Sequence, residues 1–195
     1  MGKHKHEHGR KSSREIIDAA YFMQKWGPKP GDSFLDLGCG DGYLAFAALE
    51  KVGPKGRVYA LDIDGPWLQE TAAHSETPEN LRFVAADATR NIPLVDHCLD
   101  YVLMCNILHG FANNDELGPV MCQVNRVLKP GGKLVFIEFK KADTPVGPPV
   151  DIRLKPDEIS ALIAPFGYAF AHADKIAVYH HQTTLRRLPD ISSSC

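Results

Sequence analysis

Short runs of branched and aromatic hydrophobic residues alternate with amphipathic stretches along most of the chain. The hydrophobic runs predict five strands, at Phe34–Leu37, Arg57–Asp62, Leu81–Ala85, Leu99–Cys105 and Lys133–Glu138. Helical spacing of hydrophobic residues predicts helices between them, at Tyr43–Val52, Pro66–Ser75 and Asp115–Val127. Strands and helices that alternate in this way form a parallel sheet covered on both faces. The pattern therefore predicts a doubly wound α/β fold.

A further helix is predicted before the first strand. Ser12 and Glu15 have the spacing of a capping box, and hydrophobic residues at helical spacing follow until Gly27-Pro28. We therefore expect an amphipathic helix that begins beside Ser12 and leads into the sheet.

The chain after Glu138 has a different character, because residues 140–155 are rich in proline and read as a loop. A helix at Pro156–Ala164 precedes two further strands, at Tyr168–Asp174 and Val178–Arg186. Too few residues join these strands for a crossover helix, so we expect them to pair antiparallel at the sheet edge. The complete prediction is a Rossmann-like, seven-stranded, mostly parallel sheet with an antiparallel edge strand.

Length and composition fit one globular domain, with 195 residues of which 44% are hydrophobic and 24% charged. We expect a single domain at residues 13–188, between a flexible histidine-rich tail at 1–12 and a frayed tail at 189–195. No apolar run approaches the roughly 20 residues that span a bilayer, and the amino terminus lacks the apolar core of a signal peptide. The five cysteines form no CxxC pair, which favours a reduced, cytoplasmic protein.

Net charge bears on one broad class of partner, the nucleic acids. The 22 basic and 24 acidic residues give a net charge of −2, which provides no general attraction to DNA or RNA. Nucleic-acid binding would need a local basic patch, so we expect no nucleic-acid partner, and the lack of an apolar run of about 20 residues predicts no membrane insertion.

The strongest local signal is a glycine-rich turn after the first strand, Leu35-Asp36-Leu37-Gly38-Cys39-Gly40-Asp41-Gly42-Tyr43. Glycines permit positive φ and let a ligand approach the backbone closely. Asp62 ends the second strand about 20 residues beyond the turn, where a carboxylate accepts hydrogen bonds from ribose hydroxyls. The turn and the acid together predict a ligand that contains adenosine.

Charge and volume then distinguish between adenosine ligands. Tyr43 is too large for a dinucleotide GxGxxG turn, Asp41 would repel a pyrophosphate, and a P-loop Gly-Lys-Ser/Thr is absent. Asp36 and Asp41 are compatible with a ligand that carries an ammonium and a sulfonium but no phosphate. S-adenosylmethionine has these charges, so we expect it to be the cofactor.

At this point the sequence resembles the class I S-adenosylmethionine-dependent methyltransferases. Leu35–Gly42 resembles the first motif of that family, Tyr59–Asp64 its acidic motif, and Ala86–Ala88 its adenine-contacting motif. Val127–Leu134 resembles its approach to the fifth strand. Within the family, the run Val52–Tyr59 is most similar to small enzymes related to the ubiquinone and menaquinone C-methyltransferases.

The resemblance implies cofactor contacts near the carboxyl ends of the first four strands, made by Asp36, Gly38, Gly40, Asp62, Ile63, Asp87, Ala88 and Asn106. Asp62 would bind the ribose, Ile63 would lie against the adenine, and Asp87 with the Ala88 amide would meet the adenine edge. The two glycines would line the methionine moiety. Asp36 and the carbonyl of Asn106 would meet its amino group. The family's residue between the second and third glycines of the motif is often small and neutral, so Asp41 departs from the pattern.

His109, just beyond the fourth strand, is the candidate catalytic residue. Histidine titrates near neutral pH and suits a general base if the acceptor must lose a proton. A purely structural histidine is the alternative. Tyr21 and Arg153 are weaker candidates for the wall of the acceptor pocket.

We expect no metal site, because magnesium-dependent relatives use a carboxylate where this chain has Met104-Cys105-Asn106. His4, His6 and His8 have side chains that suit zinc or nickel, but a flexible terminus explains them more simply.

The function predicted is therefore methyl transfer from S-adenosylmethionine to a small-molecule acceptor. A protein or RNA methyltransferase of the same fold is one alternative, and a non-catalytic S-adenosylmethionine-binding regulator is another. A nicotinamide oxidoreductase is a more distant third.

Overall fold

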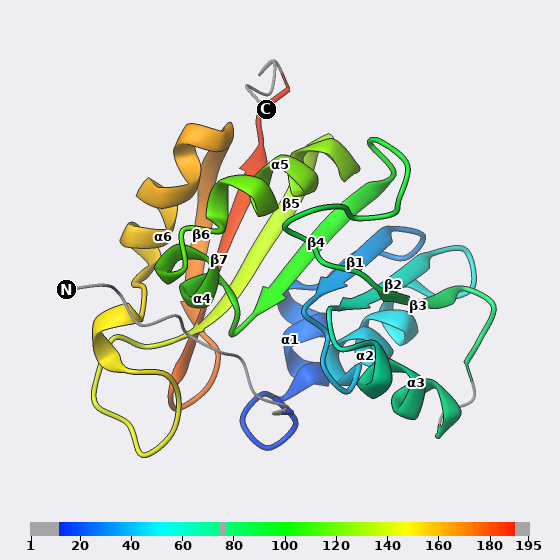
Figure 1. Ribbon diagram of the computed structural model, residues 1–195, viewed down its shortest axis with the longest axis horizontal. Coiled ribbons are helices and arrows are strands. Elements are labelled where there is room, and N and C mark those ends of the chain that lie inside the picture. The colour runs from blue at the N-terminus through cyan, green and yellow to red at the C-terminus, as the bar shows by residue number, and fades with distance from the viewer. Residues whose placement is uncertain (1–11, 75–76, 190–195) are drawn as a thin grey trace.

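The computed structural model describes residues 12–74 and 77–189, which form a twisted sheet between two layers of helices (Figure 1). The strands are β1 (Ser33–Leu37), β2 (Arg57–Asp62), β3 (Leu81–Ala85), β4 (Leu99–Cys105), β5 (Leu128–Phe139), β6 (Tyr168–Lys175) and β7 (His180–Arg187). The helices are α1 (Ala19–Trp26), α2 (Tyr43–Val52), α3 (Gly65–Ala73), α4 (Leu108–Asn113), α5 (Leu117–Val127) and α6 (Pro156–Ile163). Short 3-10 turns occupy Val150–Ile152 and Ala164–Phe166.

The sheet has seven strands in the order β3-β2-β1-β4-β5-β7-β6. Strands β1 to β5 pair in parallel, whereas β7 runs antiparallel to both β5 and β6. The predicted fold class is confirmed, and the antiparallel strand lies between β5 and the edge strand β6. The order reverses at β1 and β4, so their carboxyl ends border the crevice where ligands of such sheets bind.

The sheet is buried on both faces, which explains the nearly continuous hydrophobic runs of its central strands. Leu35 and Val102 contribute to the core beneath α4, α5 and α6, and both are fully buried. Phe34 and Tyr101 contribute to the opposite core beneath α1 and α2, where their rings lie 5.1 Å apart. Burial of each such side chain stabilises the fold by roughly 1.5–3 kcal/mol. These two cores hold the carboxyl ends of β1 and β4 in place.

The predicted start of the first helix is wrong. Residues Ser13 to Ile17 form a turn, in which the Ile17 amide donates to the Ser13 carbonyl at 2.9 Å. The helix begins only at Ala19, because Asp18 is its N-cap and accepts a hydrogen bond from the Tyr21 amide at 2.9 Å. Asp18, and not Ser12, is therefore the residue that caps the helix, and the spacing of Ser12 and Glu15 does not start one.

Other boundaries differ by a few residues, and one element is additional. Strand β5 begins at Leu128, which pairs with Leu99 of β4, so the predicted Lys129–Gly132 turn lies within the strand. Helix α4 was not predicted. The tails predicted at 1–12 and 189–195, including His4, His6 and His8, lie almost entirely outside the described residues.

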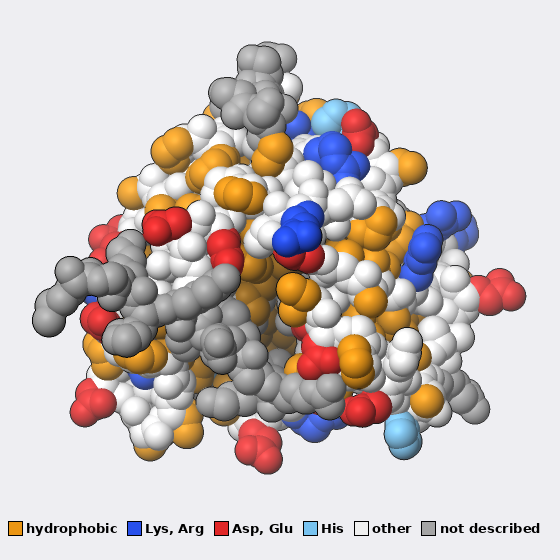
Figure 2. All heavy atoms as spheres, in the orientation of Figure 1, with side chains coloured by type: hydrophobic (Ala, Val, Ile, Leu, Met, Phe, Trp, Pro, Cys, Tyr) orange, Lys and Arg blue, Asp and Glu red, His pale blue; other side chains and the backbone are white. Residues whose placement is uncertain are grey.

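Figure 2 shows acidic and basic side chains interspersed among small hydrophobic groups on the face that carries α4, α5 and α6. No helix within residues 12–74 and 77–189 combines the length and hydropathy that crossing a membrane requires.

Candidate functional site

The glycine turn joins β1 to α2 and is hydrogen-bonded to the end of β2. Gly38, Gly40 and Gly42 have φ values of 75°, 55° and 73°, which side chains rarely tolerate. The amides of Gly38 and Cys39 donate to the Leu61 carbonyl at 2.8 and 3.0 Å. A Cβ atom at Gly38 would lie 2.8 Å from the Ile107 side chain. Glycine is therefore required at the turn by both conformation and space.

Asp62 is held beside this turn by two hydrogen bonds. Its Oδ2 atom accepts from the Gly40 amide at 2.9 Å, and its Oδ1 atom accepts from the Asp64 amide at 3.0 Å. Each carboxylate oxygen retains a further lone pair for a ligand hydroxyl. The structure thus brings the predicted ribose-binding acid to the predicted turn.

Asp36 is the most perturbed acid of the site. Its side chain is 1% exposed, and neither oxygen has a hydrogen-bond partner. Burial raises the pKa of Asp36 to about 7, and the charges of Asp62 and Asp41 add to this effect. The Ala45 amide partly offsets it, although its geometry toward the carboxyl is not that of a hydrogen bond. A ligand cation would relieve the unfavourable burial of this carboxylate.

The predicted adenine-binding residues lie at the ends of β2 and β3. Ile63, which follows Asp62, is 73% exposed and offers an open apolar surface to a flat ring. Asp87 accepts hydrogen bonds from the Thr89 amide at 2.9 Å and the Thr89 hydroxyl at 2.6 Å. Ala88 is buried. These contacts fix the loop after β3, and the role of Asp87 and Ala88 toward adenine stays a prediction.

Asn106 and His109 follow β4 at the same edge of the sheet. Asn106 has a φ of 57°, its amide donates to the Ile137 carbonyl at 2.8 Å, and its buried side-chain oxygen has no hydrogen-bond partner. His109 is 2% exposed, and its Nδ1 atom lies 2.7 Å from Oε2 of Glu138, which is itself 1% exposed. The other Glu138 oxygen accepts from the Leu108 amide at 2.9 Å.

Glu138 is a residue that the sequence reasoning missed. The available signal is a single acid within the apolar run Val135–Phe139 of a buried strand. Because a carboxylate only accepts hydrogen bonds, its contact places the imidazole proton of His109 on Nδ1. Glu138 thus orients the predicted base.

Asp41 has a partner that the family motif does not explain. Its Oδ2 atom lies 3.6 Å from the Arg14 guanidinium, which in turn lies 4.5 Å from the centre of the Tyr43 ring. The Tyr43 hydroxyl donates to the Ile17 carbonyl at 3.1 Å and accepts from the Ala19 amide at 3.3 Å. These contacts tie the segment before α1 to the glycine turn.

The two candidates for the wall of the acceptor pocket, Tyr21 and Arg153, each make contacts of their own. Tyr21 is 48% exposed, and its ring packs against the edge of Trp26. Arg153 is buried, and its guanidinium donates to loop carbonyls that include those of Pro148 at 2.9 Å and Ala142 at 2.6 Å. Arg153 therefore holds the proline-rich loop together. Within the described residues, no group of three or more His, Cys, Asp or Glu side chains is arranged to bind a metal.

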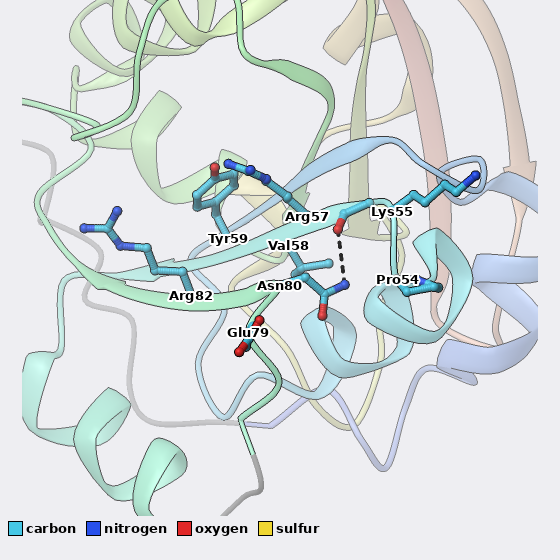
Figure 3. Close-up of a pocket in the computed structure, with 9 residues that line it drawn as sticks. Pro54, Lys55, Arg57, Val58, Tyr59, Glu79, Asn80 and Arg82 are labelled. Carbon is cyan, nitrogen blue, oxygen red and sulfur yellow. Dashed lines mark hydrogen bonds between the residues drawn. The ribbon is translucent and has the colours of Figure 1, made fainter.

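A hollow of about 620 Å³ lies at the amino ends of β2 and β3, away from the glycine turn (Figure 3). Arg57 and Tyr59 extend from β2, and Arg82 extends from β3, beside it. The side-chain amide of Asn80 donates to the Gly56 carbonyl at 3.1 Å and fixes the loop that leads into β2. No predicted site residue lines this hollow.

A doubly wound sheet with a glycine turn after β1 and an acid at the end of β2 defines a nucleoside-binding α/β protein. The methyltransferase-domain family matches residues 28–166, more than half of the chain, so the protein belongs to this family. The resemblance to S-adenosylmethionine-dependent methyltransferases is confirmed, and S-adenosylmethionine is the cofactor that the family and the charges of the site indicate.

Two kinds of relative agree with this assignment. The chain is 33% identical over 124 residues to the demethylmenaquinone methyltransferase of Staphylococcus aureus (strain JH9), a match that covers 64% of this chain and 50% of that protein. The chain thus spans about half the length of the curated relatives it matches.

The solved structures show the fold. A SAM-dependent methyltransferase from Aquifex aeolicus superimposes with a TM-score of 0.78 at 23% identity, covering 92% of this chain and 95% of that one. The 1,6-didemethyltoxoflavin-N1-methyltransferase of Burkholderia thailandensis, solved with bound 1,6-didemethyltoxoflavin and S-adenosylhomocysteine, gives a TM-score of 0.62 at 20% identity, covering 87% of this chain and 76% of that one.

Proposed function

We propose that this protein transfers a methyl group from S-adenosylmethionine to a small-molecule acceptor. The observation that carries the proposal is Asp36, a buried carboxylate without a hydrogen-bond partner beside a glycine turn. A buried polar group without a partner is costly, so its retention indicates a ligand that satisfies it. The positively charged ammonium group of the methionine moiety can serve as the missing partner of the Asp36 carboxylate.

The other cofactor contacts follow from the placement of the remaining residues. Asp62 binds the ribose hydroxyls while the Gly40 and Asp64 amides hold its carboxylate in place. Ile63 lies against the adenine, and Asp87 with the Ala88 amide meets the adenine edge. Gly38 and Gly40 border the methionine moiety, and the Asn106 carbonyl accepts from its amino group.

S-adenosylmethionine supplies a methyl group that the positive sulfur has already activated. The protein therefore has to hold the acceptor in line with that group and exclude water. His109 serves as the general base when the acceptor must lose a proton. Its Nδ1 proton is directed to Glu138, so Nε2 is the nitrogen that accepts the proton.

The proposed acceptor class is a planar ring compound that carries an oxygen substituent. The support is the 33% identity to a demethylmenaquinone methyltransferase, whose named substrate is a quinone. Net charge supports a small acceptor over a nucleic acid, because −2 provides no general attraction to a polyanion.

The test is transfer of a radiolabelled methyl group from S-adenosylmethionine to a panel of reduced quinones and phenols. We expect S-adenosylhomocysteine to form in proportion to methylated acceptor, and the variant Asp62→Ala to lose this activity. A folded protein that binds S-adenosylhomocysteine but methylates no acceptor would instead support a non-catalytic regulator.

A further inference from the structure

Two buried side chains among the described residues have both of their polar atoms without a hydrogen-bond partner. One is Asp36, which the proposed cofactor explains. The other is His180, the first residue of β7, whose side chain is fully buried. Leaving both nitrogens of an imidazole unpaired in the interior is unfavourable and needs an explanation.

The next residue of β7, His181, is also buried, but it has a hydrogen-bond partner. His181 is 5% exposed, and its Nε2 atom lies 2.9 Å from the Leu154 carbonyl. Consecutive residues of a strand point to opposite faces, so His181 lies on the α4–α6 side and His180 on the α1 side. Only the histidine on the α1 side lacks partners.

His180 and Asp36 lie on the same face and at the same edge of the sheet. The Cα atom of His180 is opposite that of Phe139, at the carboxyl end of β5. Three strand spacings, about 14 Å, separate β1 from β7, and the pairing register places Thr184 level with Asp36, so His180 lies a further four residues, about 13 Å, along β7. A methionine amino group bound at Asp36 does not extend that far, so His180 requires a second ligand.

The surroundings of His180 define the chemistry of that ligand. Burial lowers the pKa of His180 to about 4, and the nearby charges of His181, Lys140 and Arg153 add to the effect. The imidazole is therefore neutral at physiological pH, with one N–H donor and one bare acceptor nitrogen. The Lys140 ammonium already donates to the carbonyls of Ala177 and Val178. An uncharged hydroxyl or carbonyl suits this nitrogen pair better than an anion.

The ring beside His180 adds a flat apolar surface. The Phe139 ring centre lies 4.0 Å from that of His180, and the Arg153 guanidinium lies 5.2 Å from the Phe139 ring centre. A Cβ atom at Gly147 would lie 2.8 Å from the Phe139 ring, so the proline-rich loop packs closely against Phe139. The β4 end, where Asn106 lies, is two strand spacings or about 10 Å away, which a bicyclic ring can bridge.

We propose that His180 recognises the methyl acceptor by a hydrogen bond to an uncharged ring oxygen, with the acceptor entering beneath the proline-rich loop against Phe139. The proposal rests on the proposed function, since it assigns the second ligand to the acceptor. His180 is thus a specificity-determining residue, distinct from the base His109.

The test uses two probes that differ by one oxygen, 1-naphthol and naphthalene, titrated into protein saturated with S-adenosylhomocysteine. We expect the wild type to bind 1-naphthol about tenfold more tightly than naphthalene, the value of one net hydrogen bond to a buried group. In His180→Phe the preference should disappear, whereas His180→Gln should restore part of it.

The control is Thr184→Val, a near-isosteric change on the same face of β7 about 13 Å further along the strand. It should keep the full preference for 1-naphthol. Failure of 1-naphthol to bind, or an unchanged preference in His180→Phe, would overturn the proposal even if S-adenosylhomocysteine binds normally. Loss of S-adenosylhomocysteine binding by the wild type would refute the proposed function instead.

Discussion

Replacing Asp36 by asparagine should make the protein more stable and its cofactor binding weaker. Burial raises the pKa of Asp36 from 3.8 to about 7. The folded state therefore binds this proton more tightly than the unfolded state, and ionisation of the carboxyl opposes folding. The penalty is absent below about pH 4, grows between pH 4 and 7, and is complete above pH 7.

The magnitude follows from the same shift. A shift of about three pH units corresponds to roughly 4 kcal/mol at alkaline pH, at 1.36 kcal/mol for each unit. An unpaired buried amide still costs about 1–3 kcal/mol, so the net gain of Asp36→Asn at pH 8 is about 1–3 kcal/mol. For a chain of this length that gain raises Tm by roughly 2–12 °C.

Calorimetry of both proteins from pH 4.5 to 8.5 measures this effect, with exposed Asp151→Asn as the control. We expect the stability difference to grow with pH, and S-adenosylhomocysteine to bind the variant about 10–150-fold more weakly. An Asp36→Asn protein that is less stable than wild type at pH 8, or a difference independent of pH, would refute the reasoning.

Three further changes test separate parts of the site. Asp62→Ala removes the ribose acceptor and should weaken S-adenosylhomocysteine binding by roughly 30–150-fold, measured by calorimetric titration; unchanged affinity in a folded variant would exclude the ribose role. Tyr43→Phe removes the hydroxyl bond to Ile17 and should speed S-adenosylhomocysteine dissociation by about 3–10-fold in stopped-flow measurements, whereas an unaltered rate would show that the segment before α1 does not retain the cofactor. Glu138→Gln should slow methyl transfer by about 10–100-fold with little change in S-adenosylhomocysteine affinity, because it removes the carboxylate that orients His109 while its amide oxygen can still accept from the Leu108 amide; a parallel loss of affinity would indicate a structural role.

The strands were the most predictable part of the fold. Strands β2, β3 and β4 match their predicted bounds because each is a branched hydrophobic run bounded by glycine, proline, asparagine or aspartate. The glycine turn and Asp62 were also predictable, since local spacing alone brings a turn and the next strand end together. Both depend on residues close in sequence.

Contacts between distant segments were not predictable. Helix α4 is only six residues long, and its first turn is capped by Glu138, which lies 30 residues further along the chain from Leu108. Capping by a side chain from another strand leaves no local signal. The burial of the His180 ring without hydrogen-bond partners could not be predicted either. The sequence His-His-Gln-Thr-Thr is typical of a polar edge strand, whereas in the structure these residues are buried.

The most direct test of the central claim is a calorimetric titration of the purified protein with S-adenosylhomocysteine, in parallel with NADH and with Asp62→Ala. We expect S-adenosylhomocysteine to bind the wild type, to bind Asp62→Ala far more weakly, and NADH not to bind. A folded wild-type protein that binds NADH and not S-adenosylhomocysteine would contradict the assignment of the glycine turn and Asp62 to this cofactor.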